Sequence, residues 1–167
     1  PVLARTDFEI AARAAKEGNV PAVHRRIVRM LGSACRELGD EVSAEAHYRM
    51  AIELAHAATD RTDEAAALGN LGYLMAQLGR PNEARDALQT ALATHIETGD
   101  HRWQLRERIT LANVLLDLGE LGDASHELET ACALARAAGN PGMEGRAQGA
   151  LGRYHLLAGD GDAAESR

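Results

Sequence analysis

A fixed spacing of glycines most strongly limits how this chain can fold. Gly39, Gly79, Gly119 and Gly159 recur with one constant period, and a subsidiary repeat occurs at half that period. A period of about 40 residues is typical of solenoids, in which each unit buries its apolar faces against its neighbours. The 167 residues are therefore expected to form an array that grows along an axis rather than around one core.

Apolar residues within each unit have helical spacing. Leu68, Leu71, Met75 and Leu78 follow one another at intervals of three and four, which places them on one face of a helix. The glycine that follows such a run fits the left-handed position that commonly ends a helix. No segment shows the alternation of a half-buried strand. The sequence therefore predicts an all-α fold.

The repeat sets the expected domain organisation. Residues 1–20 are interpreted as the second helix of a preceding repeat, and residues 21–60, 61–100 and 101–140 as complete repeats. Residues 141–167 are interpreted as a truncated repeat that breaks at Gly159 and begins a second helix. Asp40, Asp60 and Asp100 are expected to cap helices, because an aspartate before a helix accepts a hydrogen bond from its first turn.

Alignment of the repeats gives columns of small and large residues. The first helices share the small residues Gly32, Gly72, Ala112 and Gly152; the second helices share Ala4, Ala44, Ala84, Ala124 and Ala164, followed by the larger Phe8, Tyr48, Leu88 and Leu128. A glycine inside a helix costs up to about 1 kcal/mol relative to alanine. We therefore expect a neighbouring backbone to approach the glycine column closely, with the large residues filling the space between repeats.

These columns, together with the leucine–glycine step and the glycine turn, resemble the tetratricopeptide repeat, in a variety longer than the usual one. The longer variety is found in spindle-orientation scaffolds, kinesin light chains, and bacterial signalling ATPases and transcription regulators. The resemblance implies a right-handed superhelical solenoid of antiparallel helix pairs. It covers essentially the whole chain, although Ala112 replaces the glycine of its column.

The resemblance also implies a binding surface, because the first helices of such arrays line a concave groove. Carried over to this sequence, the groove positions are Arg26, Arg29, Ser33, Arg36, Asn70, Tyr73, Gln77, Arg106, Asn113, Asp117, Arg146 and Arg153. The second helices carry many acidic residues. We therefore expect a locally basic groove and an acidic back, with a protein or peptide partner that offers an acidic or C-terminal segment. The alternative is that these arginines are solvated or paired with neighbouring carboxylates.

Some family members hold a peptide's terminal carboxylate with basic and asparagine side chains on successive first helices. Arg29, Asn70 and Arg106 resemble part of that clamp, whereas Ser33 and Thr110 depart from it. In the central repeat, Asn70, Tyr73 and Gln77 are uncharged between neighbours that carry arginine. We expect this repeat to contact the side chains of a ligand while the flanking arginines bind its charge.

The amino-acid composition limits the cellular environment and the classes of partner that we expect for this chain. The net charge of −7 argues against direct nucleic-acid binding, which needs a basic surface. No apolar run is long enough to span a membrane. Abundant arginine and alanine with a single lysine favour a bacterial source, and two widely separated cysteines favour a reduced, cytoplasmic location. Targeting cannot be judged, because the chain begins at Pro1.

The sequence shows no pattern that indicates catalysis, a cofactor or a metal. None of the seven histidines pairs with another ligand at a metal-binding spacing. The Gly69–Gly72 pair lies within a helix and cannot cradle phosphate. The chain is therefore predicted not to be an enzyme. Cys35 and Cys132 are interpreted as buried small residues, with redox sensing as the alternative.

Three functional hypotheses follow. The first is a protein- or peptide-binding module of a larger bacterial regulatory or scaffold protein. The second is a ligand sensor of a bacterial signalling ATPase or transcription regulator, in which the small residues Ala66, Gly69 and Gly149 make room for a small molecule. The third is an oligomerisation element, since the end repeats are expected to expose apolar surface that self-association could cover.

Overall fold

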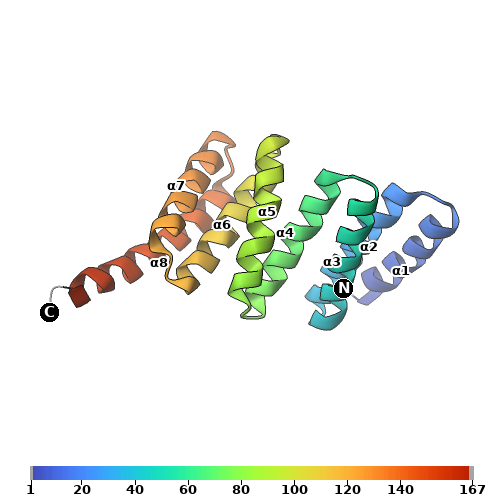
Figure 1. The fold of residues 1–167 in the computed structure, drawn as a ribbon, viewed down its shortest axis with the longest axis horizontal. Helices are drawn as coiled ribbons and strands as arrows, with labels where there is room; N and C mark the ends of the chain where they lie inside the picture. Colours follow the sequence, from blue (N-terminus) through green and yellow to red (C-terminus); the bar gives the residue numbers. More distant parts are fainter. Residues whose placement is uncertain (1, 166–167) are drawn as a thin grey trace.

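The computed structural model describes residues 2–165, with side chains described for residues 5–159. Helices account for all the secondary structure in this part of the chain, and Figure 1 shows them stacked side by side along one axis, with α1 at one end and α8 at the other. They are α1 (Val2–Glu17), α2 (Pro21–Glu37), α3 (Glu41–Ala57), α4 (Arg61–Gln77), α5 (Pro81–Glu97), α6 (His101–Leu118), α7 (Leu121–Ala137) and α8 (Pro141–Glu165). The predicted all-α solenoid is confirmed.

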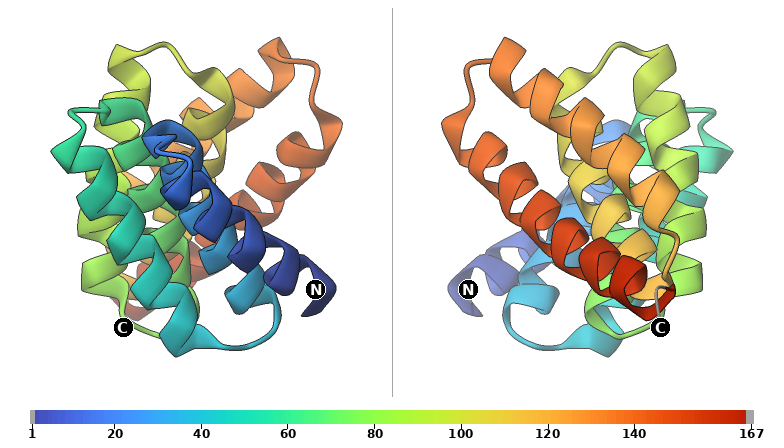
Figure 2. Two further views of the ribbon diagram at one scale, coloured as in Figure 1. Left: turned by 90° about the vertical axis from the view of Figure 1, so that its right-hand side faces the viewer. Right: turned by 90° about the vertical axis from the view of Figure 1, so that its left-hand side faces the viewer.

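The helices form two unequal layers. Consecutive helices pack against one another throughout, and the first helices of successive repeats also touch in the pairs α2–α4, α4–α6 and α6–α8. Within the described chain, no such contact joins α3 to α5 or α5 to α7. The first helices therefore lie on the inner side of the curve and the second helices on the outer side. Figure 2 views this arrangement from its two ends, with α1 in front in one view and α8 in front in the other.

The turns between helices share one backbone geometry. A residue with positive φ follows each helix from α1 to α7, at Asn19, Gly39, Thr59, Gly79, Gly99, Gly119 and Gly139. Glycine adopts this conformation without strain, whereas a β-branched residue such as Thr59 is strained by about 1–2 kcal/mol. The predicted caps are also confirmed, because the side chains of Asp40, Asp60 and Asp100 each accept a hydrogen bond from the backbone N–H three residues later.

Each of four N-cap residues forms an ion pair with a residue on the second helix before its own, for example the N-cap of α3 with a residue of α1. Each pair joins residues 35 positions apart, at N–O distances of 2.8–3.0 Å: Arg5–Asp40, Arg25–Asp60, Glu45–Arg80 and Arg85–Glu120. In three of the pairs the arginine comes first in the chain, whereas in Glu45–Arg80 the acidic residue comes first. Partly exposed pairs of this kind add little to overall stability, because water and salt screen them. Their main effect is to fix the spacing of helices that have little other contact.

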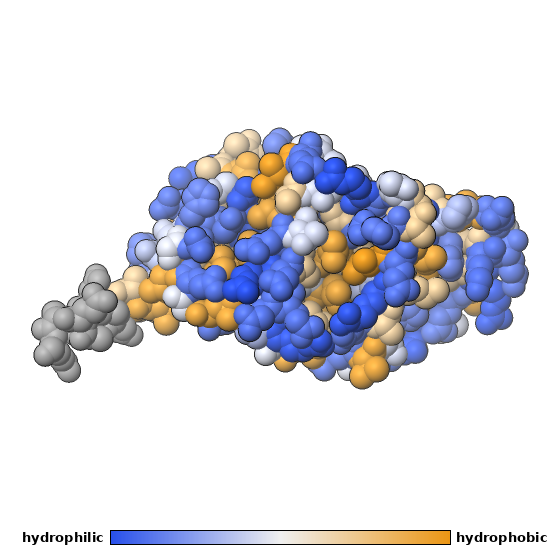
Figure 3. All heavy atoms as spheres, in the orientation of Figure 1, coloured by the Kyte–Doolittle hydropathy of each residue, from blue (hydrophilic) through white to orange (hydrophobic). Residues whose placement is uncertain are grey.

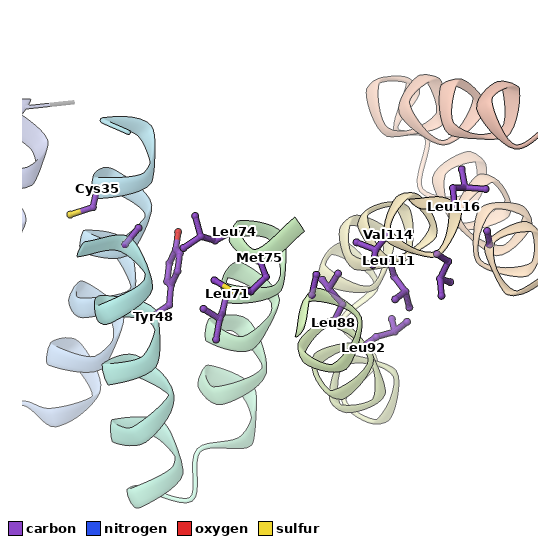
Figure 4. Close-up of a cluster of buried hydrophobic side chains, with 14 residues drawn as sticks. Cys35, Tyr48, Leu71, Leu74, Met75, Leu88, Leu92, Leu111, Val114 and Leu116 are labelled. Carbon is purple, nitrogen blue, oxygen red and sulfur yellow. The ribbon is translucent and has the colours of Figure 1, made fainter. Parts of the chain in front are cut away.

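The large residues of the second helices form the core between layers, as predicted. Tyr48, Leu88 and Leu128 are at most 1% exposed. Figure 4 shows Tyr48 beside Leu74 of α4, and Leu88 and Leu92 of α5 facing the side chains of α6. Phe8, which belongs to the same column, is only half-buried. Each fully buried side chain of this size contributes about 1.5–3 kcal/mol through removal from water.

The glycine column has a different cause from the one expected. A Cβ atom on Gly32 would lie 2.6 Å from the Tyr48 ring, and one on Gly72 would lie 2.7 Å from Cγ of Leu88. Backbone comes close only at Gly72, where the carbonyl oxygen of Ala84 would be 3.1 Å away. A large side chain from the following helix, rather than a neighbouring backbone, therefore excludes a side chain from these two positions.

The prediction for the last repeat is wrong in one respect. Helix α8 continues through Gly159 as far as Glu165, so no second helix begins after this glycine. Apart from the surrounding backbone of α8, no heavy atom of the described residues lies within 4 Å of the Cβ position of Gly152, in contrast to its equivalents Gly32 and Gly72. A turn at Gly159 would be favoured only if the following segment could bury an apolar face against α8. Ala4 and Ala164 lie outside the residues whose side chains are described.

The outer surface is largely polar. Figure 3 shows hydrophilic residues over most of the face seen in Figure 1, interrupted by small hydrophobic patches. No described helix combines the length and the hydropathy that crossing a membrane requires.

Candidate functional site

Three adjoining pockets of about 300, 270 and 230 Å³ follow the inner face of the first helices. The first lies between α2, α4 and α6, the second lies around Asn70 and Arg106, and the third lies between α4 and α6 near their C-terminal halves. Tyr73 and Arg146 line both the second and the third pockets. Together we name these three pockets the inner groove.

Eleven of the twelve residues expected in a groove line these pockets. Arg26 and Arg29 line the first pocket. The second is lined by Ser33, Arg36, Asn70, Tyr73, Arg106 and Arg146, and the third also by Gln77, Asn113 and Asp117. Arg153 lines none of them. Its guanidinium bonds instead with the carboxylate of Asp117 and, at 3.4 Å, the amide oxygen of Asn113.

Trp103 was missed by sequence reasoning. It is the only tryptophan in the chain, and it lines the first pocket beside Arg29. The guanidinium of Arg106 lies 4.2 Å from the centre of its ring and that of Arg29 lies 5.7 Å away, both within cation–π range. Trp103 lies near the start of α6, and the other repeats have no aromatic residue at the equivalent position. The columns of similar residues therefore did not predict a role for it.

Arg106 lies in the middle of the inner groove and has no carboxylate within ion-pair distance among the described residues. Its Nη2 donates a hydrogen bond to Oδ1 of Asn70 at 2.9 Å. Burial lowers the pKa of Arg106; the nearby Glu107 carboxyl group opposes this shift, and the positive charges of Arg29 and Arg36 add to it. Arginine nevertheless stays protonated in proteins. The groove therefore holds a desolvated positive charge that a carboxylate or phosphate of a ligand would stabilise.

Arg29 and Arg36 have similarly weak compensation. Burial lowers the pKa of Arg29, whose Nε has no hydrogen-bond partner, and the nearby Asp63 charge only partly opposes this shift. Arg36 lies 5.1 Å from the Tyr73 ring centre and 4.0 Å from the Glu37 carboxylate, at the outer limit of an ion pair. Arg29 of the first pocket and Arg36 and Arg106 of the second therefore have no close ion pair among the described residues.

Acidic side chains of the second helices are largely engaged by arginines outside the inner groove. Glu45 bonds with Arg49 and Arg80, and Glu83 also bonds with Arg80. Glu127 bonds with Arg108 in a half-buried pair. Much of the acidic charge on the outer helices is therefore neutralised locally.

A buried titratable pair lies beneath the groove. Glu107 of α6 and His95 of α5 are at most 1% exposed, and Oε1 of Glu107 lies 3.5 Å from Nε2 of His95. Neither side chain has a hydrogen-bond partner within the described residues. Burial raises the pKa of Glu107 to about 8 and lowers the pKa of His95. Both groups are therefore uncharged near neutral pH.

Gly69 does not make room for a ligand, contrary to the ligand-sensor hypothesis. A Cβ atom on Gly69 would clash with Oε1 of Glu107. This glycine thus makes room for a buried carboxyl group and does not widen the groove for a ligand. Ala66 does line the first pocket, and the Cβ position of Gly149 is open.

Among the described residues, the cysteine, histidine and acidic side chains form neither a disulfide nor a metal cluster. Both cysteines are buried and unpaired, and burial raises the pKa of each thiol, which favours the unreactive protonated form. No cluster of three or more histidine, cysteine or acidic side chains suitable for a metal was found in the part of the chain described.

Comparison with solved structures shows which proteins share this architecture. The putative kinesin light chain repeats of Podosopora anserina superpose with a TM-score of 0.71 at 17% identity, covering 97% of this chain and 89% of theirs. BtubC (BKLC) from P. vanneervenii superposes with a TM-score of 0.65 at 16% identity, covering 93% of this chain and 75% of that one. At such identities the similarity establishes the fold. No match was found among curated proteins.

Models of the tetratricopeptide repeat match most of the sequence. One matches residues 25–97 and again residues 63–137, and a second matches residues 145–167. These matches agree with the glycine period, the paired helices and the inner layer of first helices. The chain therefore belongs to the tetratricopeptide repeat family.

Proposed function

We propose that the inner groove binds an acidic segment of a partner protein, internal or C-terminal. Tetratricopeptide repeats generally mediate protein–protein interaction, and their fold is typically a non-enzymatic scaffold. The observation that carries the proposal is the cationic middle of the groove. Arg29 and Arg106 have no carboxylate within ion-pair distance among the described residues, and Arg36 has only a distant one.

The contacts refine how such a segment would be recognised. Asn70 is 8% exposed and already accepts a hydrogen bond from Arg106, so its role is to hold that guanidinium in place. Tyr73 is partly exposed and Gln77 is exposed, and both line the groove. Within the central repeat, these two side chains rather than Asn70 are left to contact the side chains of a ligand.

The charge of the groove also sets where the segment would lie. Asp117 faces the groove at its α6 end but bonds with Arg153, so this end is close to neutral. The cationic stretch runs from Arg26 to Arg106 across α2, α4 and α6. Carboxylates are bound well by arginine, whose planar group donates two parallel hydrogen bonds. The acidic residues of a ligand should therefore contact the first three repeats.

Selection from a random peptide library tests this proposal. The native chain should enrich acidic peptides, and Arg29→Glu/Arg106→Glu should lose them because reversed charges repel carboxylates. Arg13→Glu/Lys16→Glu is the matched control, since it makes the same change in charge on exposed positions of α1 outside the groove. Enrichment of the same peptides by both double variants would show that the groove is not the binding surface.

A further inference from the structure

A fourth pocket opens between the third and fourth repeats and adjoins the inner groove, with which it shares Trp103, Arg106 and Arg146. It has a volume of about 500 Å³ and lies between the N-terminal half of α6, the end of α7 and the start of α8. Pockets that bind small molecules usually measure about 300–1,000 Å³ and are mostly apolar with a few well-placed polar groups. We name it the α6–α8 pocket.

The walls of the α6–α8 pocket provide a substantial apolar surface. Leu105 is 4% exposed, and Leu134 and Met143 are half-buried beside it. Trp103 forms part of the wall toward the inner groove. A ligand with an apolar body could remove the exposed parts of Trp103, Leu134 and Met143 from water, with a gain of about 25 cal/mol for each Å² buried.

The rim of the same pocket is cationic and has no acidic residue among its lining side chains. Arg102, Arg106 and Arg146 line it, and none has a carboxylate within ion-pair distance in the described part of the chain. Arg106 donates to Asn70, while Nη1 of Arg146 lies 3.6 Å from Sδ of Met143. Three guanidinium groups thus surround an apolar space without a balancing negative charge.

We propose that the α6–α8 pocket binds a small organic anion with an apolar body. The apolar part would contact Leu105, Leu134 and Met143, and the anionic group would accept hydrogen bonds from the arginines of the rim. An inorganic anion would leave the apolar walls in water, and a neutral apolar molecule would leave the arginines uncompensated. Both features therefore have to be met by one molecule. The ligand differs from the peptide proposed for the inner groove, although Arg106 and Arg146 line both sites.

Three probes separate the two requirements: octanoate, which has an alkyl chain and a carboxylate; 1-octanol, which lacks the charge; and acetate, which lacks the chain. The emission of Trp103 reports binding, because this is the only tryptophan in the chain and none of the probes absorbs in its range. Octanoate should change the emission saturably with one site per chain. Octanol should bind at least about tenfold more weakly, and acetate should have no effect at the same concentrations.

Two variants test whether octanoate binds in the α6–α8 pocket. Arg102→Ala/Arg146→Ala should weaken octanoate binding at least about tenfold, the loss expected when charge-assisted hydrogen bonds are removed. Met143→Glu should abolish it, because the new carboxylate would occupy the arginines; it lies in the first turn of α8, where an acidic residue is favourable for folding. Arg13→Ala, an exposed arginine of α1 with no carboxylate within ion-pair distance in the described chain, is the matched control and should bind as the native chain does.

The proposal would be overturned by any of three results. The first is the absence of a saturable response to octanoate, and the second is equal affinity for octanoate and 1-octanol. The third is unchanged octanoate affinity in Arg102→Ala/Arg146→Ala. This double variant changes two exposed side chains, so its test remains valid even if Met143→Glu disturbs packing, which far-ultraviolet circular dichroism would reveal.

Discussion

Glu107 and His95 are two titratable side chains held out of water between α4, α5 and α6. Because burial favours the uncharged form of each, folding shifts their pKa values in opposite directions, with that of Glu107 rising to about 8. Gly69 lacks a side chain at the position that the Glu107 carboxyl group fills. The free-energy cost of this buried pair must be offset by the packing of the surrounding helices.

Protonation of Glu107 predicts a specific dependence of stability on pH. Its folded pKa lies above the usual value of 4.5, so the native state binds more protons than the unfolded state between these values. The stability that this group contributes is therefore fully present at acidic pH and is lost as pH rises through about 8. Between pH 7 and pH 8 the free energy of unfolding should fall by about 1 kcal/mol because of this group. Urea unfolding at closely spaced pH values measures that slope.

Glu107→Gln provides the control for this prediction. The substitution removes the titrating proton, so the variant should show little change in stability between pH 7 and pH 8, whatever its absolute stability. His95 adds little to the slope, because its ordinary pKa of 6.5 in the unfolded state and its lowered pKa in the folded state leave it mostly uncharged above pH 7. A slope in Glu107→Gln equal to that of the native chain would assign the pH dependence to other groups.

At the scale of the helix, the glycine column shows how one residue type serves two different environments. Gly72 faces Leu88 in a packed interface, whereas Gly152 faces open space on α8. The same substitution should therefore have opposite effects. Gly72→Ala should destabilise the fold by about 1–3 kcal/mol through overpacking. Gly152→Ala should stabilise it by up to about 1 kcal/mol through helix propensity. Thermal denaturation of the two variants measures both effects.

A double-mutant cycle tests the cause of the Gly72 effect. In a Leu88→Ala background the obstructing side chain is absent, so adding Gly72→Ala should cost less than it does in the native background. Coupling between the two positions is expected because their atoms are in direct contact. Strict additivity would instead point to the carbonyl oxygen of Ala84 as the obstacle.

At the scale of the whole molecule, stability should vary along the array. Helices α4, α5 and α6 pack against neighbours on both sides, whereas α8 packs only against α6 and α7 within the described chain and exposes Leu156. In a solenoid, stability is approximately the sum of terms for each repeat and each interface between neighbours. The end that has fewer interfaces should therefore open more readily than the middle.

Hydrogen exchange measures this difference directly. Backbone amides from Gly152 to Gly159 in α8 should exchange faster than amides of the same helical environment from Leu71 to Gln77 in α4, because they open with a lower free energy. Equal protection in the two segments would show that the array unfolds as one cooperative unit rather than repeat by repeat.

Periodicity alone determined a large part of this structure. The regular glycine spacing, the helical spacing of leucines and the aspartate caps each depend on local backbone geometry, which the sequence encodes directly. The half-period appears in the structure as the regular positive φ values at the turns and as the recurring ion pairs between alternate helices. The groove positions came from the resemblance to the tetratricopeptide repeat, and the regular array places residues of one helix face together.

Only the tertiary structure decided which charges are compensated and which remain free. Asp117 and Arg153 lie in different repeats yet bond, while Arg106 has an asparagine where a carboxylate could have been. Burial of Glu107 and the position of Trp103 likewise depend on side chains from three helices. These contacts join segments that are far apart in the sequence, and burial depends on them. A repeat pattern specifies where the helices lie but not which of their side chains meet. The same holds for α8, which runs through Gly159, because a glycine inside a helix costs only about 1 kcal/mol and does not by itself end the helix.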